Sequence, residues 1–242
     1  MIRTALAAAA ISALALPAAA QELSEERIKE LVYEAILENP QIVMDAVDLL
    51  REREAAEAEM AAAAAMEEQA ELLYEDPGAP VLGNPEGDVT IVEFFDYNCP
   101  YCKRAAQTIE ALVEADPQLR VVFREWPILG EGSVAASRAS LAAREQGEGL
   151  YEIFHYALMN APGRLTEASV MQIAADSGLD VERLREDMGS DAVDEHIANS
   201  MALAEALGIN GTPAFVVGDT LVPGAVPIEE LVGLVASKRE EG

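Results

Sequence analysis

The residues most suited to chemistry are two cysteines with two residues between them, Cys99 and Cys102. A thiolate attacks disulfides, and a second thiol one helical turn away can resolve the mixed disulfide that forms. Pro100 and Tyr101 lie between them, and proline suits the first turn of a helix because no hydrogen bond is lost there. The free N–H groups and the dipole at a helix start stabilise a thiolate. The spacing therefore predicts a reversible dithiol switch, with Cys99 as the exposed nucleophile and Cys102 as the resolving thiol.

Two other roles for the cysteine pair stay open at this point. A purely structural disulfide would close so small a loop that it would constrain the unfolded chain little. A metal site would need further ligands, and the two histidines, His155 and His196, do not lie at metal-ligand spacing from the cysteines. We expect each histidine to have a helix-packing or surface role.

The elements around the cysteines would place them at the entrance of a helix. The apolar run from Val89 to Phe95 predicts a buried strand, and residues 100–115 predict a helix that closes before Pro117. A second strand is predicted over residues 119–124. A strand, a helix and a strand of these lengths form a right-handed βαβ unit.

The rest of the chain alternates between a helical stretch and a short hairpin. Residues 133–207 carry helical signals throughout, and Gly208 suits a C-terminal cap. The candidate N-terminal caps in this stretch are Ser133, Thr166, Asp180 and Ser190. A hairpin is predicted over residues 214–222 around Gly218-Asp219, followed by a last helix over residues 228–238.

The run from Glu93 to Cys102, together with Gly211-Thr212-Pro213 downstream, resembles the DsbA-like branch of the thioredoxin superfamily. The resemblance covers residues 81–238. It implies an α/β thioredoxin fold with an all-helical insertion at about residues 130–207. It also implies that Pro213 is a cis-proline facing the cysteines, and that Thr212, Pro213, Pro100 and Tyr101 contact substrate.

Glu93 lies six residues before Cys99, where the DsbA family keeps a buried acid under its active site. A carboxylate inside an apolar strand is unfavourable unless its pKa rises or it finds a partner. A raised pKa would let Glu93 relay protons to and from Cys102, whereas the alternative is an edge-strand glutamate that faces water. The neighbouring residues expected at the surface are Asp96 and Tyr97 at the rim and Lys103 and Arg104 on the first turn of the helix.

The first twenty residues predict a signal peptide. Arg3 is followed by an apolar stretch over residues 5–16 and by small residues at Ala18 and Ala20, which suit a cleavage site. Export by a bacterium, with the periplasm as the compartment, is the expected consequence. The net charge of −28 excludes nucleic acid as a natural partner because such a field repels phosphates.

Residues 21–75 predict a helical module followed by an Ala/Glu-rich helical linker, and the cluster at 76–80 predicts the start of a second domain over residues 76–242. Apolar stripes over residues 28–36 and 43–50 flank Asn39-Pro40 and are too short to form a core alone, so we expect a homo-oligomer through residues 22–50. This segment is similar to the N-terminal module of ScsC-like proteins. Those are DsbA-like proteins linked to copper tolerance, and in some of them the module makes oligomers.

The sequence therefore predicts an exported thiol–disulfide oxidoreductase that acts on protein disulfides and needs no cofactor beyond its own cysteine pair. Tyr101 and Thr212 differ from the DsbA oxidase and resemble the isomerases DsbC and DsbG, which favours isomerase or reductase activity. The alternatives are a dithiol oxidase, or a copper-tolerance protein that binds Cu(I) through the two thiolates. The expected partners are exported client proteins with cysteines and a membrane redox partner that resets the pair.

Overall fold

The structure is a computed structural model that describes residues 24–241. The predicted signal peptide and its cleavage site lie outside these residues. The chain divides into two compact units, one ending at Glu54 and one beginning at Ala55. This division falls earlier in the sequence than the predicted domain start at residue 76.

The N-terminal unit is helical. Helix α1, Glu25–Glu38, begins at Ser24, whose hydroxyl accepts the N–H of Arg27 at 3.2 Å. Helix α2, Gln41–Glu68, begins directly after Asn39-Pro40. No residue of α1 is buried, and apolar side chains such as Val32 and Leu50 are exposed. The two predicted apolar stripes are therefore present, and they face solvent in the single chain.

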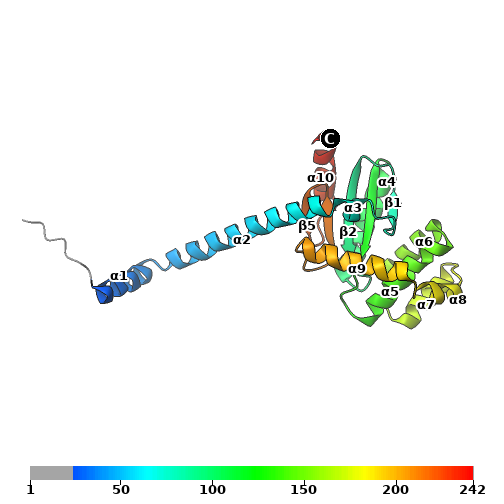
Figure 1. Ribbon diagram of the computed structural model, residues 1–242, viewed down its shortest axis with the longest axis horizontal. Coiled ribbons are helices and arrows are strands. Elements are labelled where there is room, and N and C mark those ends of the chain that lie inside the picture. The colour runs from blue at the N-terminus through cyan, green and yellow to red at the C-terminus, as the bar shows by residue number, and fades with distance from the viewer. Residues whose placement is uncertain (1–23, 242) are drawn as a thin grey trace, which may run out of the picture. The chain divides into compact units, whose positions relative to one another are not determined.

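The larger unit is built on one five-stranded sheet of order β1-β3-β2-β4-β5 (Figure 1). The strands are β1 (Val81–Gly83), β2 (Val89–Phe95), β3 (Leu119–Glu125), β4 (Ala214–Val217) and β5 (Thr220–Pro223). Strands β2 and β3 are parallel and joined by α4, Pro100–Ala115, so the predicted βαβ unit is confirmed. The other neighbouring strands pair in antiparallel fashion. Strand β1 was not predicted, because three residues carry no periodic signal.

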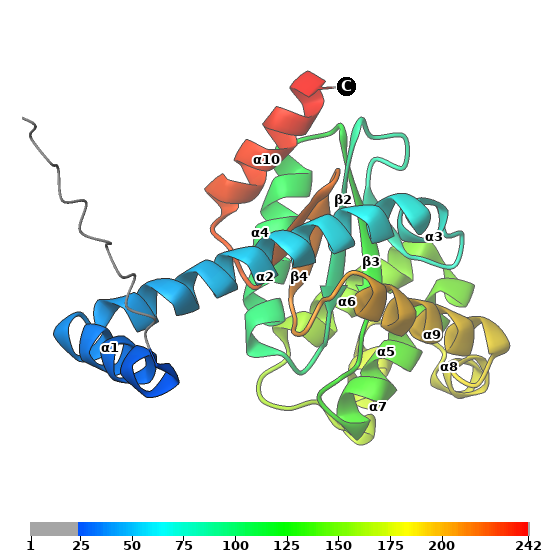
Figure 2. The same ribbon diagram turned by 60° about the vertical axis from the view of Figure 1, so that its left-hand side comes forward.

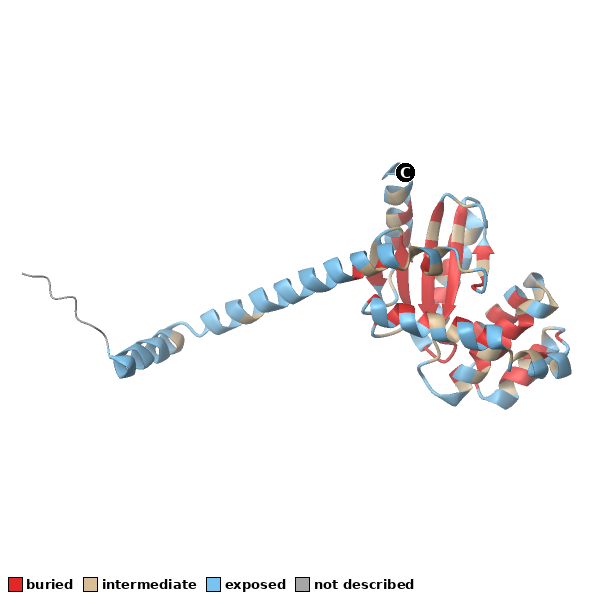
Figure 3. Ribbon diagram, in the orientation of Figure 1, coloured by how far each residue is buried: buried red, intermediate tan, exposed pale blue. Residues whose placement is uncertain are grey.

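The two faces of the sheet are covered by different helices, because side chains alternate along a strand. Ile91 and Phe95 belong to the cluster that packs against α4 and α10, Ile228–Glu241. Val92 and Phe94 belong to the opposite cluster, which includes residues of α2, α3 (Ala70–Tyr74) and α9 (Asp191–Ala206) (Figure 2). Figure 3 shows buried residues along the strands and on the helices of the insertion.

The second half of the predicted linker is not fully solvated. Ala62, Met66 and Leu73 are buried in the cluster on the α9 face of the sheet. The helical run ends at Glu68, and the short α3 follows after Gln69. Residues 62–74 therefore contribute side chains to the core of the larger unit.

The predicted helical insertion is confirmed. It consists of α5 (Glu131–Ala143), a short 3₁₀ turn (Arg144–Gln146), α6 (Glu148–Asn160), α7 (Glu167–Asp176), α8 (Val181–Asp187) and α9. Thr166, Asp180 and Ser190 are N-caps as predicted. Ser133 is not a cap, because α5 begins at Glu131 and the buried Ser133 hydroxyl accepts a hydrogen bond from Asn98 instead.

Candidate active site

The cysteine pair opens helix α4. Cys99 is its N-cap residue and Pro100 is the first helical residue, so Cys102 lies one turn inside. Both thiols are free. Cys99 is only 4% exposed, so the expectation of an exposed nucleophile was wrong. Its sulfur lies 3.3 Å from the carbonyl oxygen of Thr212, which shows that the segment before β4 packs against it.

The two thiols have opposite acidities. A hydrogen bond from the Cys102 side chain, reinforced by the Thr212 side chain and by backbone N–H groups of the first turn, lowers the pKa of Cys99 to about 5 although burial opposes the shift. Burial, followed by the hydrogen bond to Cys99 and the charge of Glu93, raises the pKa of Cys102 well above its usual value. At neutral pH Cys99 is therefore the thiolate nucleophile and Cys102 remains a thiol.

Glu93 is buried beneath this helix. It lies in the central strand β2, on the same face as Ile91 and Phe95, which is the face that α4 covers. It is 1% exposed, and its Oε1 atom has no hydrogen-bond partner in the described part of the chain. Burial, and then the charge of Cys99, raises its pKa to about 8. The alternative of an edge-strand glutamate facing water is therefore wrong.

The substrate-facing residues expected from the resemblance also meet at this site. The Thr212–Pro213 peptide bond is cis, as expected, and it immediately precedes β4. Pro213 is buried, while Tyr101 is 56% exposed beside the cysteines, with the guanidinium of Arg104 lying 4.5 Å from its ring centre. Tyr101 is thus the aromatic side chain that the CxxC segment offers to solvent.

Asp96 is fully buried rather than at the rim, which corrects the expectation. Its Oδ1 accepts the N–H of Asn98 at 2.7 Å, and its Oδ2 accepts the N–H groups of Ile128 and Leu129 at 2.8 and 2.9 Å. One carboxylate therefore holds the approach to the cysteines and the loop after β3 together.

Tyr97 is also buried, and the prediction of a rim position was wrong for the same reason: its polar atom finds partners inside the fold. The phenol oxygen lies 2.5 Å from the hydroxyl of Ser140 and 2.9 Å from Nδ1 of His155. Burial lowers the pKa of His155 to about 3, and its ring stacks on Phe123. His155 is therefore a neutral residue with a packing role, which is one of the two roles expected for it.

Two further residues secure the cysteine segment to the helical insertion, and local sequence patterns did not indicate either. The side chain of Asn98 donates to Ser133 and accepts the N–H of Leu165 at 2.6 Å. Lys103 is half-buried rather than exposed as expected, because its ammonium group donates to the carbonyl oxygen of Ala161 at 2.5 Å. Arg104 is exposed as expected.

Neither a metal site nor a membrane span is found in residues 24–241. No three histidine, cysteine or acidic side chains among them are grouped so that they could hold a metal ion. No helix in this range has the length and apolar character needed to cross a bilayer.

The strand–CxxC–helix arrangement facing a cis-proline defines a thioredoxin-type redox site. Residues 90–236 match the DSBA-like thioredoxin domain, and the chain belongs to that family. Residues 25–57 match the copper resistance protein ScsC N-terminal domain.

Solved structures resemble the chain over both regions. A thioredoxin-like oxidoreductase from Silicibacter pomeroyi is 59% identical, with a TM-score of 0.68 over 70% of this chain and 97% of that one. Proteus mirabilis ScsC in a transitional conformation is 30% identical, with a TM-score of 0.69 over 93% of this chain and 99% of that one.

Curated relatives are similar to this chain over part of its length. The thiol:disulfide interchange protein DsbA of Bordetella pertussis is 29% identical over 149 residues, which cover 60% of this chain and 70% of DsbA. The Na⁺/H⁺ antiporter NhaA 1 of Salinispora arenicola is 30% identical over 157 residues, or 65% of this chain. The match spans only 24% of that antiporter's length.

Proposed function

We propose that this protein is an exported, periplasmic thiol–disulfide oxidoreductase that isomerises or reduces disulfides in client proteins. The observation that carries the thiol–disulfide exchange chemistry is the opposite acidity of the two thiols, with the pKa of Cys99 at about 5 and that of Cys102 far higher. The isomerase or reductase direction is favoured by Tyr101 and Thr212, which resemble the corresponding residues of DsbC and DsbG. A nucleophile that is ionised at neutral pH beside a resolving thiol that stays protonated is the arrangement that disulfide exchange needs.

The proposed reaction begins when the Cys99 thiolate attacks one sulfur of a client disulfide. A Cys99–client mixed disulfide forms, and the other client sulfur leaves as a thiolate. In isomerisation that thiolate, or another client thiolate, attacks the client sulfur of the mixed disulfide, which releases Cys99 and leaves the electron count unchanged. In reduction Cys102 attacks the Cys99 sulfur, which forms the Cys99–Cys102 disulfide and releases a client dithiol. A membrane dithiol partner then supplies two electrons to reset the pair.

Glu93 is the proposed proton acceptor for Cys102. The Cys102 thiol must lose its proton before it can attack, and its raised pKa makes that loss unfavourable without a nearby base. The pKa of Glu93, about 8, lies close to the working pH, so the carboxyl group exchanges a proton at little free-energy cost. No cofactor takes part in this scheme.

The N-terminal unit supports an assembly of several copies. It matches the ScsC N-terminal domain, and its apolar side chains are exposed in the single chain. We propose that these surfaces bury one another in a homo-oligomer through residues 22–50, which would present several cysteine pairs to one misfolded client.

A dithiol oxidase is the second candidate, and the low pKa of Cys99 favours it. A stabilised thiolate stabilises the reduced enzyme, which makes the disulfide form a stronger oxidant. The similarity to DsbA of Bordetella pertussis points the same way. A difference of about 30 mV in potential changes the balance tenfold, so the direction of the reaction must be measured.

The deciding experiment is reactivation of a scrambled multi-disulfide protein by the pre-reduced chain, with Cys99→Ser as the control. Recovery of client activity that is absent in the variant would support isomerisation. No recovery, combined with rapid insertion of disulfides into a reduced client by the oxidised chain, would transfer the assignment to oxidase. Stoichiometric Cu(I) retained against a competing chelator, with neither redox activity, would instead indicate a copper-binding protein.

A further inference from the structure

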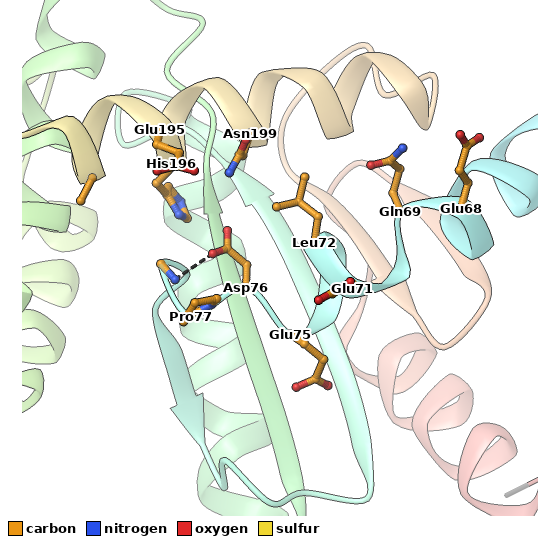
Figure 4. A pocket seen from close by; sticks show the side chains of 12 residues that line it. Glu68, Gln69, Glu71, Leu72, Glu75, Asp76, Pro77, Glu195, His196 and Asn199 are labelled. Atoms are coloured by element: carbon orange, nitrogen blue, oxygen red, sulfur yellow. Dashed lines mark hydrogen bonds between the residues drawn. The ribbon is translucent and has the colours of Figure 1, made fainter.

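A second concave site lies in the larger unit, between the segment that carries α3 and helix α9 (Figure 4). It is a pocket of about 500 Å³, a size typical of small-ligand sites. Its lining includes five acidic residues and no lysine or arginine. The acidic residues are Glu68, Glu71, Glu75, Asp76 and Glu195.

Most of this negative charge is not neutralised within the fold. Asp76 is paired with the buried Arg124 at 2.5 Å, and Glu75 lies 3.9 Å from Arg120. The remaining three acidic residues form no ion pair with a described side chain. The pocket therefore carries an excess of negative charge, on exposed carboxylates that line it, and this charge attracts cations.

The buried side chain of His196 provides a second, independent sign of a ligand site. His196 is 2% exposed, and its Nε2 atom lies 2.8 Å from Oε2 of Glu125. Its Nδ1 atom has no hydrogen-bond partner in the described part of the chain, although the residue lines the pocket. Figure 4 shows its ring directed from α9 toward the turn that carries Asp76.

This arrangement assigns Nδ1 of His196 as an acceptor. The carboxylate of Glu125 beside Nε2 favours the tautomer with the proton on Nε2, which leaves a lone pair on Nδ1. A buried acceptor without a donor is unfavourable, and a ligand that carries N–H groups would satisfy it. The pocket thus offers acceptors at its wall and at its base.

The rest of the lining indicates which kind of cation fits. Leu72, Pro77 and Ala192 give apolar surface between the charged groups, which suits methylene groups. No three potential ligands in residues 24–241 are close enough together for a metal ion. A chain with ammonium groups at both ends and methylenes between them matches this pattern.

We propose that the pocket binds a linear diamine or polyamine, whose ammonium groups are held by the unpaired carboxylates of the lining and by Nδ1 of His196. The site is separate from the cysteine chemistry, and it holds whether the protein acts as an isomerase or as an oxidase.

The test is a titration of the reduced full chain with spermidine, followed by NMR of the histidine side chains. The buffer contains 150 mM NaCl, at which charges in solvent are screened over about 8 Å. The chain has two histidines, and His155 is an internal reference because it is stacked on Phe123. We expect a saturable shift of the His196 Nδ1 signal, with one ligand per chain, while the His155 signals stay unchanged. A non-saturating shift, or an equal shift with MgCl₂ at the same charge concentration, would overturn the proposal as general counterion binding.

Variants separate the pocket from the overall acidity of the chain. Glu71→Gln and Glu195→Gln should each raise the spermidine Kd about two- to fivefold, as expected for loss of one exposed ionic contact. Glu167→Gln, on α7 outside the pocket lining, is the matched control and should leave the Kd unchanged. Equal effects of all three variants would contradict the proposal. Nα-acetyl-lysine amide has a single ammonium group, and binding of this compound as tight as that of spermidine would also contradict the proposal.

Discussion

The sulfur of Cys99 lies 3.3 Å from the carbonyl oxygen of Thr212, which is 113 residues further along the chain. This contact joins the start of α4 to the segment that enters β4. The nucleophile is therefore enclosed by two distant parts of the sequence, and its acidity depends on both of them together with Cys102.

The hydrogen bond from Cys102 is the largest cause of the low pKa of Cys99, so its removal should raise that pKa. In the reduced Cys102→Ala variant we expect the titration midpoint of Cys99 to move from about 5 toward the ordinary value of 9. The rate of alkylation by iodoacetamide as a function of pH measures this midpoint. An unchanged midpoint would show that the backbone N–H groups and Thr212 are sufficient.

Glu93 should make the stability of the protein depend on pH. Folding raises its pKa from 4.5 to about 8, so the folded state holds the proton more tightly and stability falls as pH rises through this interval. In the oxidised protein, where Cys99 carries no charge, Glu93→Gln should raise the free energy of unfolding at pH 8 by more than about 1.4 kcal/mol, the equivalent of one pKa unit.

Urea denaturation at pH 4 and at pH 8 measures this effect, and the two proteins should be similar in stability at pH 4. The exposed Glu229→Gln change is the control and should not alter the pH dependence. If the free energy of unfolding changed by the same amount between pH 4 and pH 8 in Glu93→Gln and in the unchanged protein, a raised pKa of Glu93 would be contradicted.

The phenol of Tyr97 should stabilise the fold around the site. Tyr97→Phe leaves the buried hydroxyl of Ser140 and Nδ1 of His155 without this partner, so we expect a loss of about 1–3 kcal/mol in the free energy of unfolding. Thermal denaturation measures it. Tyr101→Phe removes the same atom from an exposed ring and should change stability by less than about 0.5 kcal/mol. Equal effects of the two changes would refute the role given to Tyr97.

The exposed apolar side chains of the N-terminal unit should hold the oligomer together. Replacement of Val32 and Leu50 by Glu would place charges where another copy buries apolar surface, and we expect the assembly to dissociate. Sedimentation velocity measures the mass. Glu34→Gln, an exposed change on the same helix, should leave the mass unaltered. A monomer in the unchanged protein would rule out the proposed assembly.

Strand β2 and the start of α4 were predicted to the residue because their signals are local. The apolar run Val89–Phe95 and the proline that opens α4 each define their element within a few neighbouring residues. Strand β1 is only three residues long and is formed through its pairing with β3, which no local pattern reveals. The same reason explains Ser133, whose hydroxyl was assigned to a cap and instead accepts from Asn98.

The polar residues of the site were harder to place than the cysteines. Asp96 and Tyr97 were expected at the rim because polar residues after a strand usually face solvent. Their partners lie in other elements: the N–H groups of residues 128 and 129 for Asp96, and Ser140 and His155 for Tyr97. A single sequence does not show which distant group will satisfy a buried polar atom. His196 was likewise treated as a packing or surface residue, and its contact with Glu125 appears only in the fold.

The enclosure of Cys99 also restricts what it can meet. A new disulfide requires the two sulfurs to approach to about 2.05 Å, and a sulfur that is 4% exposed is reached only by one that projects from its own surroundings. On two neighbouring copies both Cys99 sulfurs are equally recessed, so neither projects far enough to reach the other. Crowding many copies together therefore does not lead them to cross-link through their own nucleophiles. Each ionised sulfur remains available for a protruding disulfide on a flexible chain.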